Sequence, residues 1–368
     1  MQEESILLRF VNARIKEIGQ PEDVDFDNLV EEAVSHADEL VPDQIKAVRE
    51  RSASRVTWRR RTGNAVRRRI HRDWKEVVDT YEHLLATSEE IHSRAIGNMV
   101  RKWKRDNPSG VREASAKSGV DNALTGSELK MLVLLSLFAR ACKTGSEVGH
   151  LAFGGFSDGA TARLRTLYEL VMIHCTLAIA SYEVCERYQA YATIEYLVDL
   201  KEQRRSNEAQ ALPLDEIDKE IAEIEAEVNK LFHRYGRGIR RPFEWARPAF
   251  RSPAGRITFS DLDRHISGHA WRTVYLAANH LIHAGSFATV NGLDASKRYL
   301  NSTRAAHDED GLLFVIEGSA RLMKLIAEVF CRQFAMETVD FDECFSIRAA
   351  KEAADAVVVA IRSGPRQG

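Results

Sequence analysis

The chain has 368 residues, of which 44% are hydrophobic. A chain of this length and hydrophobic content exceeds what one compact helical core normally needs. We therefore expect a main bundle with an appendage. The formal net charge of −2 excludes a chain that is basic throughout, so any attraction to a polyanion must come from local clusters.

The apolar residues recur at three- and four-residue spacing, and the period-two alternation typical of strands is missing. The sequence therefore predicts an all-α fold, with helices at residues 3–19, 26–40, 43–61, 64–104, 127–152, 158–204, 214–235, 262–286, 308–335 and 338–362. We expect Ser127, Ser157, Asp340 and Asp342 to stabilise helix starts. Three regions follow: a helical, partly basic extension (1–73), a bundle core (74–335), and a C-terminal helix and tail (336–368).

The strongest local charge lies in residues 46–72, which hold eleven Lys or Arg and one acid, Glu50. Such a segment can bind the phosphates of RNA or DNA, and Trp58 can stack on a base. The alternative is a solvated helix face that pairs with the acidic stretch 22–39. Candidate nucleic-acid contacts are Arg59, Arg60, Arg61, Arg67, Arg68 and Arg69.

A helical hairpin is expected at about residues 181–235. Its second helix carries a heptad seam, and its first helix has apolar residues at comparable spacing, with the turn at 207–213. The two sets are Ile217, Ile221, Ile224, Val228 and Leu231, and Val184, Tyr188, Tyr191, Ile194 and Val198. The hairpin either protrudes and mediates assembly into a homo-oligomer or with a partner protein, or it is an ordinary helix pair of the bundle.

A second basic cluster, at residues 234–256, interleaves arginines such as Arg240 and Arg241 with aromatic side chains. This pattern suits single-stranded nucleic acid. Three prolines make the segment an irregular loop, however, so we favour the alternative that the aromatics anchor it to the bundle. The aromatics are Tyr235, Phe243, Trp245 and Phe250.

Residues 264–269 resemble the active-site signature of the higher-eukaryote-and-prokaryote nucleotide-binding (HEPN) ribonucleases, with Arg264 and His269 in the arginine and histidine positions. The resemblance implies a metal-independent ribonuclease, in which histidine moves the proton of a 2′-hydroxyl and arginine stabilises the phosphorane. Arginine is abundant in this chain, so the alternative is a chance pairing.

Metal and hydrolase motifs are coincidental. Glu89 and His92, like Glu147 and His150, have the spacing of di-iron bundles, but the further inward glutamates of such sites are missing. Residues 155–159 spell G-x-S-x-G without a preceding strand; we expect the glycines to end one helix and Ser157 to cap the next. We expect no metal and no cofactor.

Five cysteines without a C-x-x-C pair, mostly within apolar stretches, predict buried free thiols of a reducing compartment. The first ten residues carry acids where a signal peptide has basic residues, and the apolar stretches 131–141 and 164–180 are too short or too charged to span a bilayer. We therefore expect a cytoplasmic protein without a membrane partner.

Several segments together are similar to the bacterial domain of unknown function numbered 5677, over about residues 74–335. They are residues 164–170 (LRTLYEL), 186–188 (ERY), 235–236 (YG), 245–246 (WA) and the run from Tyr275 to 283–286 (HAGS). The resemblance implies a cytoplasmic helical bundle without an established activity, often encoded near mobile or defence genes. It also implies a central polar cluster of Arg165, Glu169 and His283.

Two hypotheses follow. In the first, the protein is a nucleic-acid-directed effector, such as a ribonuclease of toxin or phage-defence type, centred on Arg264 and His269 or on Arg165, Glu169 and His283. In the second, it is a non-catalytic binding module that assembles through the hairpin.

Overall fold

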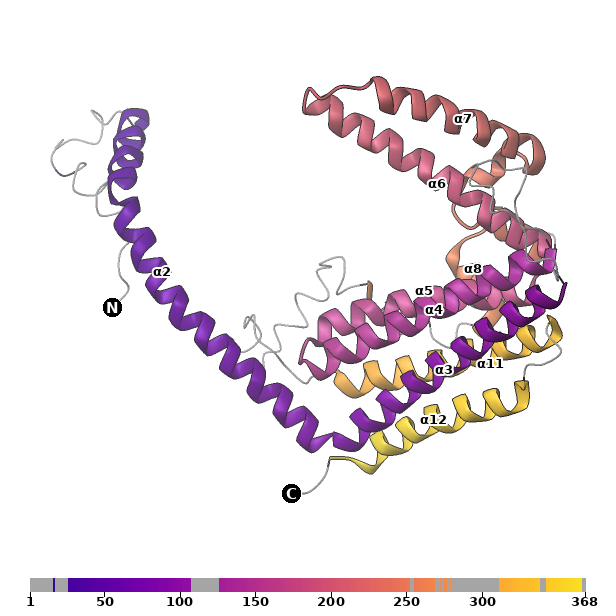
Figure 1. Ribbon diagram of the computed structural model, residues 1–368. Helices are drawn as coiled ribbons and strands as arrows, with labels where there is room; N and C mark the ends of the chain where they lie inside the picture. Colours follow the sequence, from indigo (N-terminus) through magenta and orange to yellow (C-terminus); the bar gives the residue numbers. More distant parts are fainter. Residues whose placement is uncertain are drawn as a thin grey trace. The chain divides into compact units, whose positions relative to one another are not determined.

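The computed structural model describes residues 16, 26–106, 126–251, 255–268, 311–337 and 342–365, together with positions 272, 275, 276, 278 and 279. Within these residues the chain is helical and contains no strand, which confirms the all-α fold (Figure 1). The chain divides into two compact units, Met1–Ala65 and Val66–Gly368. The predicted helix 3–19 lies almost entirely outside the described residues.

The helix α2 (Phe26–Asp73) is one continuous helix, whereas the sequence predicted separate helices at 26–40 and 43–61. The helix continues through Pro42, which lacks the backbone N–H for one hydrogen bond but does not end it. The predicted helix 64–104 is divided instead, because α2 ends at Asp73 and α3 (Lys75–Asp106) follows a single-residue turn at Trp74.

Five helices form a bundle: α3, α4 (Gly126–Phe153), α5 (Ser157–Ile179), α11 (Leu312–Glu337) and α12 (Glu343–Ser363) (Figure 1). The helix α11 contacts the other four. It is buried on several sides because apolar residues occupy most of its positions, and its Phe330 stacks on Phe138 of α4 with ring centroids 4.6 Å apart.

The predicted helix 158–204 is wrong, because the chain breaks between α5 and α6 (Tyr182–Ala209). Ala180 and Ser181 are extended, and the buried Lys130 donates a hydrogen bond of 2.8 Å from Nζ to the Ala180 carbonyl. That carbonyl therefore accepts a hydrogen bond from a lysine fifty residues earlier rather than from a backbone N–H of a continuing helix.

The glycines between α4 and α5 end α4 as predicted. Gly155 has φ 78°, in the left-handed region, and the Phe156 N–H bonds back to the Leu151 carbonyl at 2.8 Å. The predicted cap at Ser157 is wrong, since Phe156 is the N-cap and Ser157 the first helical residue. Asp342 does cap α12, because its carboxylate accepts from the Phe345 N–H at 3.0 Å.

The helices α6 and α7 (Asp215–Tyr235) form the predicted antiparallel hairpin, which extends from one end of the bundle (Figure 1). It has a small core of its own, to which all five heptad positions of α7 contribute. On α6, Tyr191 and Ile194 contribute to this core as predicted, whereas Val184 and Tyr188 pack into the core of the bundle. The prediction for Val198 is wrong, because it is 55% exposed and Leu197 and Leu200 face α7 instead.

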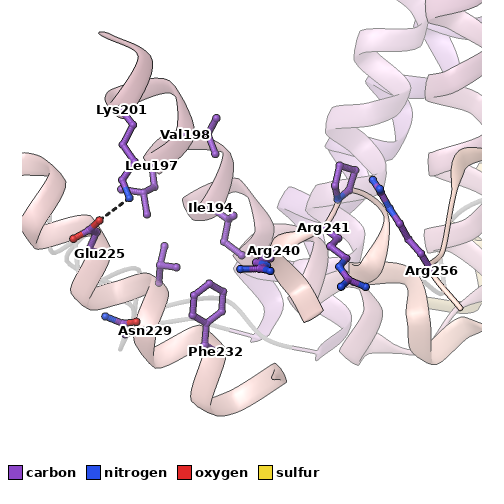
Figure 2. A pocket seen from close by; sticks show the side chains of 12 residues that line it. Ile194, Leu197, Val198, Lys201, Glu225, Asn229, Phe232, Arg240, Arg241 and Arg256 are labelled. Atoms are coloured by element: carbon purple, nitrogen blue, oxygen red, sulfur yellow. Dashed lines mark ion pairs between the residues drawn. The ribbon is translucent and has the colours of Figure 1, made fainter. Parts of the chain in front are cut away.

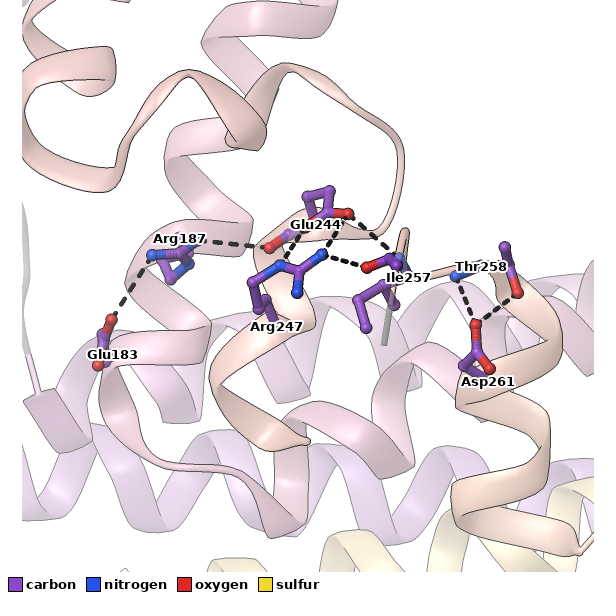
Figure 3. A network of polar contacts seen from close by, with 8 residues as sticks. Glu183, Arg187, Glu244, Arg247, Ile257, Thr258 and Asp261 are labelled. Carbon is purple, nitrogen blue, oxygen red and sulfur yellow. Dashed lines mark hydrogen bonds and ion pairs between the residues drawn. The ribbon is translucent and has the colours of Figure 1, made fainter. Parts of the chain in front are cut away.

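The chain from Tyr235 to α8 (Phe259–Ser267) forms two short 3-10 helices, η3 (Arg237–Arg240) and η4 (Glu244–Ala249). Its aromatics anchor it, as we favoured: Trp245 is buried against Tyr188 of α6, and Phe243 packs against Phe259 of α8. The buried Glu244 also fixes the segment, because its carboxylate accepts from Arg247 Nε at 2.5 Å and from the Ile257 N–H at 3.1 Å (Figure 3).

Among the described residues, no helix is both long and apolar enough to cross a bilayer. The cysteines are free thiols, and four are buried as expected, whereas Cys344 is exposed. Burial raises the pKa of the Cys142 and Cys175 thiols to about 12, so these thiols are protonated at neutral pH.

Candidate functional site

The polar residues of the bundle gather where α5 meets α8, and we call Tyr168, Asp263 and Ser267 with Arg165, Glu169 and Tyr275 the α5–α8 cluster. A capping box formed by Thr258 and Asp261 sets the start of α8. Five residues after the N-cap Thr258, α8 brings the buried Asp263 to α5, where its carboxylate accepts hydrogen bonds from the Tyr168 and Ser267 hydroxyls.

Within this half of the cluster, Tyr168 and Asp263 are closed to solvent, whereas Ser267 is partly exposed. Asp263 is 1% exposed and Tyr168 is fully buried. Burial raises the pKa of the Tyr168 hydroxyl, and the adjacent Asp263 carboxylate raises it further, so the hydroxyl remains a donor. The two hydroxyls provide hydrogen bonds to the buried Asp263 carboxylate, whose burial without them would be energetically unfavourable.

The other half of the cluster can be reached from solvent. Arg165 and Glu169 form an ion pair of 3.1 Å with side chains 20% and 35% exposed. The Arg165 guanidinium also lies over the Tyr275 ring, 5.0 Å from its centroid, and its Nη2 donates to the Tyr275 hydroxyl at 3.4 Å. Arg165 is thus a half-buried cation that can stabilise a developing negative charge.

The structure therefore brings Arg165 and Glu169 together, whereas His283 lies outside the described residues. Of the ribonuclease-like signature, Arg264 is exposed and pairs with Asp261 one turn earlier at 3.4 Å, and His269 lies outside the described residues. The neighbouring His265 packs its ring on Phe250, with centroids 5.1 Å apart.

The basic segment 46–72 of α2 is exposed along residues 48–61, with Trp58 49% exposed. Within the described part of the chain, six of its arginines make no ion pair: Arg49, Arg51, Arg55, Arg59, Arg60 and Arg61. Arg68 is likewise exposed and unpaired among these residues, whereas Arg67 and Arg69 have contacts of their own and Arg72 pairs with Asp73 at 2.6 Å.

In the second basic cluster, Arg240 and Arg241 are exposed, and neither forms an ion pair with an acid of the described ranges. The arginines nearby are engaged. Arg247 binds Glu244, and Arg234 binds Glu186 at 2.9 Å.

The di-iron-like pairs do not form a metal site. The Glu147 carboxylate pairs with Arg163, and the His92 ring packs against Phe138. Where side chains are described, no group of three His, Cys, Asp or Glu is placed to hold a metal ion.

Sequence reasoning missed His174, which lies fully buried in α5. Neither ring nitrogen has a hydrogen-bond partner among the described residues, and the ring packs against Phe330 with centroids 6.0 Å apart. Burial lowers the pKa of His174 to about 3, so the imidazole is neutral. A histidine within the apolar run 164–180 was the available signal.

Part of the chain matches a family model. Residues 131–298 match the model of a family described as a family of unknown function (DUF5677). The match lies within the range of the resemblance and includes α5, the hairpin and α8. No curated protein and no solved structure matches the chain.

Proposed function

We propose that the protein is a nucleic-acid-directed effector that contacts RNA or DNA phosphates through residues 46–72 of α2. One observation carries the proposal: the exposed stretch 48–61 of α2 bears six arginines without an ion-pair partner among the described residues. Arginine suits this role because its guanidinium donates two parallel hydrogen bonds to a phosphate.

The continuity of α2 argues against the alternative in which the acidic stretch neutralises the basic one. Residues 26–39 and 46–72 lie on the same helix, and a helix rises about 1.5 Å per residue. Glu31 and Arg55 are therefore about 36 Å apart along the axis and cannot pair within one chain.

The repulsion within the segment also favours a polyanionic partner. Arg51, Arg55 and Arg59 follow one another at four-residue spacing, and like charges at this spacing destabilise a helix. Phosphates placed along the helix would remove that repulsion and release counterions from the nucleic acid.

The test is the salt dependence of RNA and DNA binding by the full chain. With six phosphate contacts, the slope of log K against log salt is expected to be about −5, so the affinity falls about a thousandfold between 50 and 200 mM salt. Replacing Arg59, Arg60 and Arg61 together by alanine should make the slope shallower by about 3, whereas replacing them by lysine should preserve it.

An exposed arginine of the bundle, Arg348, provides the control, since Arg348→Ala should leave the slope unchanged. Binding that does not respond to salt, or an unaltered slope in the triple alanine variant, would refute the proposal.

For the effector chemistry we propose RNA cleavage centred on the solvent-reachable half of the α5–α8 cluster, where Arg165 would stabilise the phosphorane and His283 would move the proton. Its support is the half-buried Arg165–Glu169 pair. The alternative centre is Arg264 with His269.

The test is cleavage of total RNA. The RNA is incubated with the wild-type protein and with Arg165→Ala, His269→Ala and His283→Ala variants. Equal cleavage by all four proteins, or none by the wild type, would remove these residues from any mechanism. A toxin or phage-defence role rests on this activity.

A second candidate function is a non-catalytic assembly module, favoured by a hairpin that has its own core and exposes Val198 and Tyr196. Light scattering tests it. Val198→Asp alters the surface of the hairpin without touching its core, and an oligomeric state that does not respond would count against assembly through this face.

A further inference from the structure

A groove of about 690 Å³ runs between α6, α7 and the loop that follows α7 (Figure 2). Its volume lies within the range of small-molecule sites, roughly 300–1,000 Å³. Among its lining residues are Ile194, Leu197, Phe232, Arg240, Arg241 and Arg256, and we call it the hairpin groove.

The floor of the hairpin groove is apolar and fixed. Ile194, Leu197 and Val228 are at most 8% exposed, and Phe232 packs against them. Because these side chains also form the core of the hairpin, the floor is held in place by the packing of α6 on α7.

One end of the groove is strongly cationic. Figure 2 shows the Lys201–Glu225 ion pair at one end and Arg240, Arg241 and Arg256 toward the other. None of the three arginines makes an ion pair with a described acid, although Arg247 and Arg234 of the same segment both do. Three guanidinium groups that line one groove without an ion pair to a described acid favour a ligand with more than one negative charge.

The opposite end of the groove limits the length of the apolar part of that ligand. The floor terminates at the Lys201–Glu225 pair, of 2.6 Å, so a long alkyl chain would meet two charges. A compact, flat body fits the apolar floor between the two polar ends. Phe232 offers an aromatic surface, and the Asn229 amide offers both a donor and an acceptor.

We propose that the hairpin groove binds a free nucleoside phosphate, with its phosphates on Arg240, Arg241 and Arg256 and its base on the floor beside Phe232. The hairpin groove shares no residue with segment 46–72, so this inference stands apart from the proposed phosphate contacts of α2.

The experiment is calorimetric titration of the full chain with ADP, GDP, CDP and UDP, and with pyrophosphate and the four nucleosides as the separate halves of the ligand. At least one diphosphate is expected to bind at least tenfold more tightly than pyrophosphate or its own nucleoside. Arg240→Ala and Arg256→Ala should each weaken that binding by roughly tenfold or more, because each removes a charge-assisted hydrogen bond. Both side chains are exposed, so neither change threatens folding.

The matched control is Arg237→Ala, an exposed arginine of the same loop that does not line the groove, which should leave the dissociation constant unchanged. Binding by none of the four diphosphates would overturn the inference, as would equal affinity for pyrophosphate or an unaffected Arg240→Ala, Arg256→Ala double variant. If no diphosphate binds and the double variant turns an oligomer into a monomer, the occupant of the groove is a second copy of the chain, and the inference is wrong.

Discussion

Lowering the pH from 7 to 5 is expected to destabilise the bundle through one buried imidazole, that of His174. The ring is 0% exposed and neither nitrogen has a hydrogen-bond partner in the part of the chain that the structure describes, so the folded protein protonates it only at a pH far below the ordinary pKa of histidine. Its pKa is about 3 in the folded protein against an ordinary value of 6.5. Between these values the unfolded chain binds one more proton than the folded chain, and stability therefore falls as the pH falls.

The magnitude follows from the distance between the pH and the unfolded pKa. At pH 5 the unfolded imidazole lies about 1.5 pH units below its pKa, which is worth about 2 kcal/mol of lost stability relative to neutral pH. The variant His174→Leu cannot titrate and leaves no unpaired nitrogen in the core. Its free energy of unfolding relative to that of the wild type should thus rise by about 2 kcal/mol between pH 7 and pH 5.

Urea unfolding followed by circular dichroism measures both proteins at each pH. Other titrating groups are common to both and cancel in the difference. His83→Gln, which replaces an exposed imidazole on α3, is expected to keep the wild-type pH profile. A difference between His174→Leu and the wild type that does not change with pH would refute the reasoning, because the buried imidazole would then not be what resists protonation.

Two further predictions concern packing and the anchored loop. Gly149→Ala would place its Cβ 2.7 Å from the ring of Tyr81, a fully buried side chain whose hydroxyl donates to the Gly145 carbonyl at 2.9 Å, so we expect a loss of about 1–3 kcal/mol in urea unfolding. The control is Gly97→Ala on α3, whose Cβ would meet only the Arg101 side chain at 3.5 Å and which should raise the free energy of unfolding by up to about 1 kcal/mol. Equal effects of the two substitutions would contradict the close packing of Gly149 on Tyr81. Glu244→Gln should cost about 1–3 kcal/mol at pH 7 by removing the charge that holds Arg247. Arg247 lowers the pKa of Glu244 below 4.5. The difference in free energy of unfolding between Glu244→Gln and the wild type should therefore become smaller as the pH falls below that value. A difference that does not change with pH would argue against the ion pair.

Local periodicity was sufficient to predict the features whose partners are close in sequence. The heptad positions of α7 form the hairpin core, because an apolar seam has to be covered by the helix that folds back on it. The aromatics of the loop before α8 anchor it, because three prolines prevent a helix that could bury them in another way.

Features that depend on distant partners could not be predicted. The break after Ala180 depends on Lys130, fifty residues earlier, and nothing in the apolar run around Ala180 indicates it. Tyr168 meets Asp263 across 95 residues. An aspartate on a short helix carries no sequence sign that its carboxylate will be buried, since the same residue type is usually exposed.

The candidate site has the same division between local and distant partners. The family resemblance predicted Arg165 and Glu169 in one polar cluster, and the two form an ion pair, because four-residue spacing places them on one face of a helix. Four-residue spacing does not predict which part of the Arg165 guanidinium is exposed to solvent. That depends on Tyr275, 110 residues away, whose ring lies under the guanidinium.

The polar groups between α5 and α8 therefore have two different roles. The Asp263 carboxylate is buried and accepts hydrogen bonds from two hydroxyls. A ligand could reach it only by breaking these hydrogen bonds, which stabilise the charge inside the bundle. Arg165 keeps one fifth of its side chain in solvent, and its ring contact and its ion pair fix the guanidinium without enclosing it. A negatively charged substrate that approaches α5 would meet Arg165 first, with Asp263 and Tyr168 behind it as the rigid support that holds α8 in place.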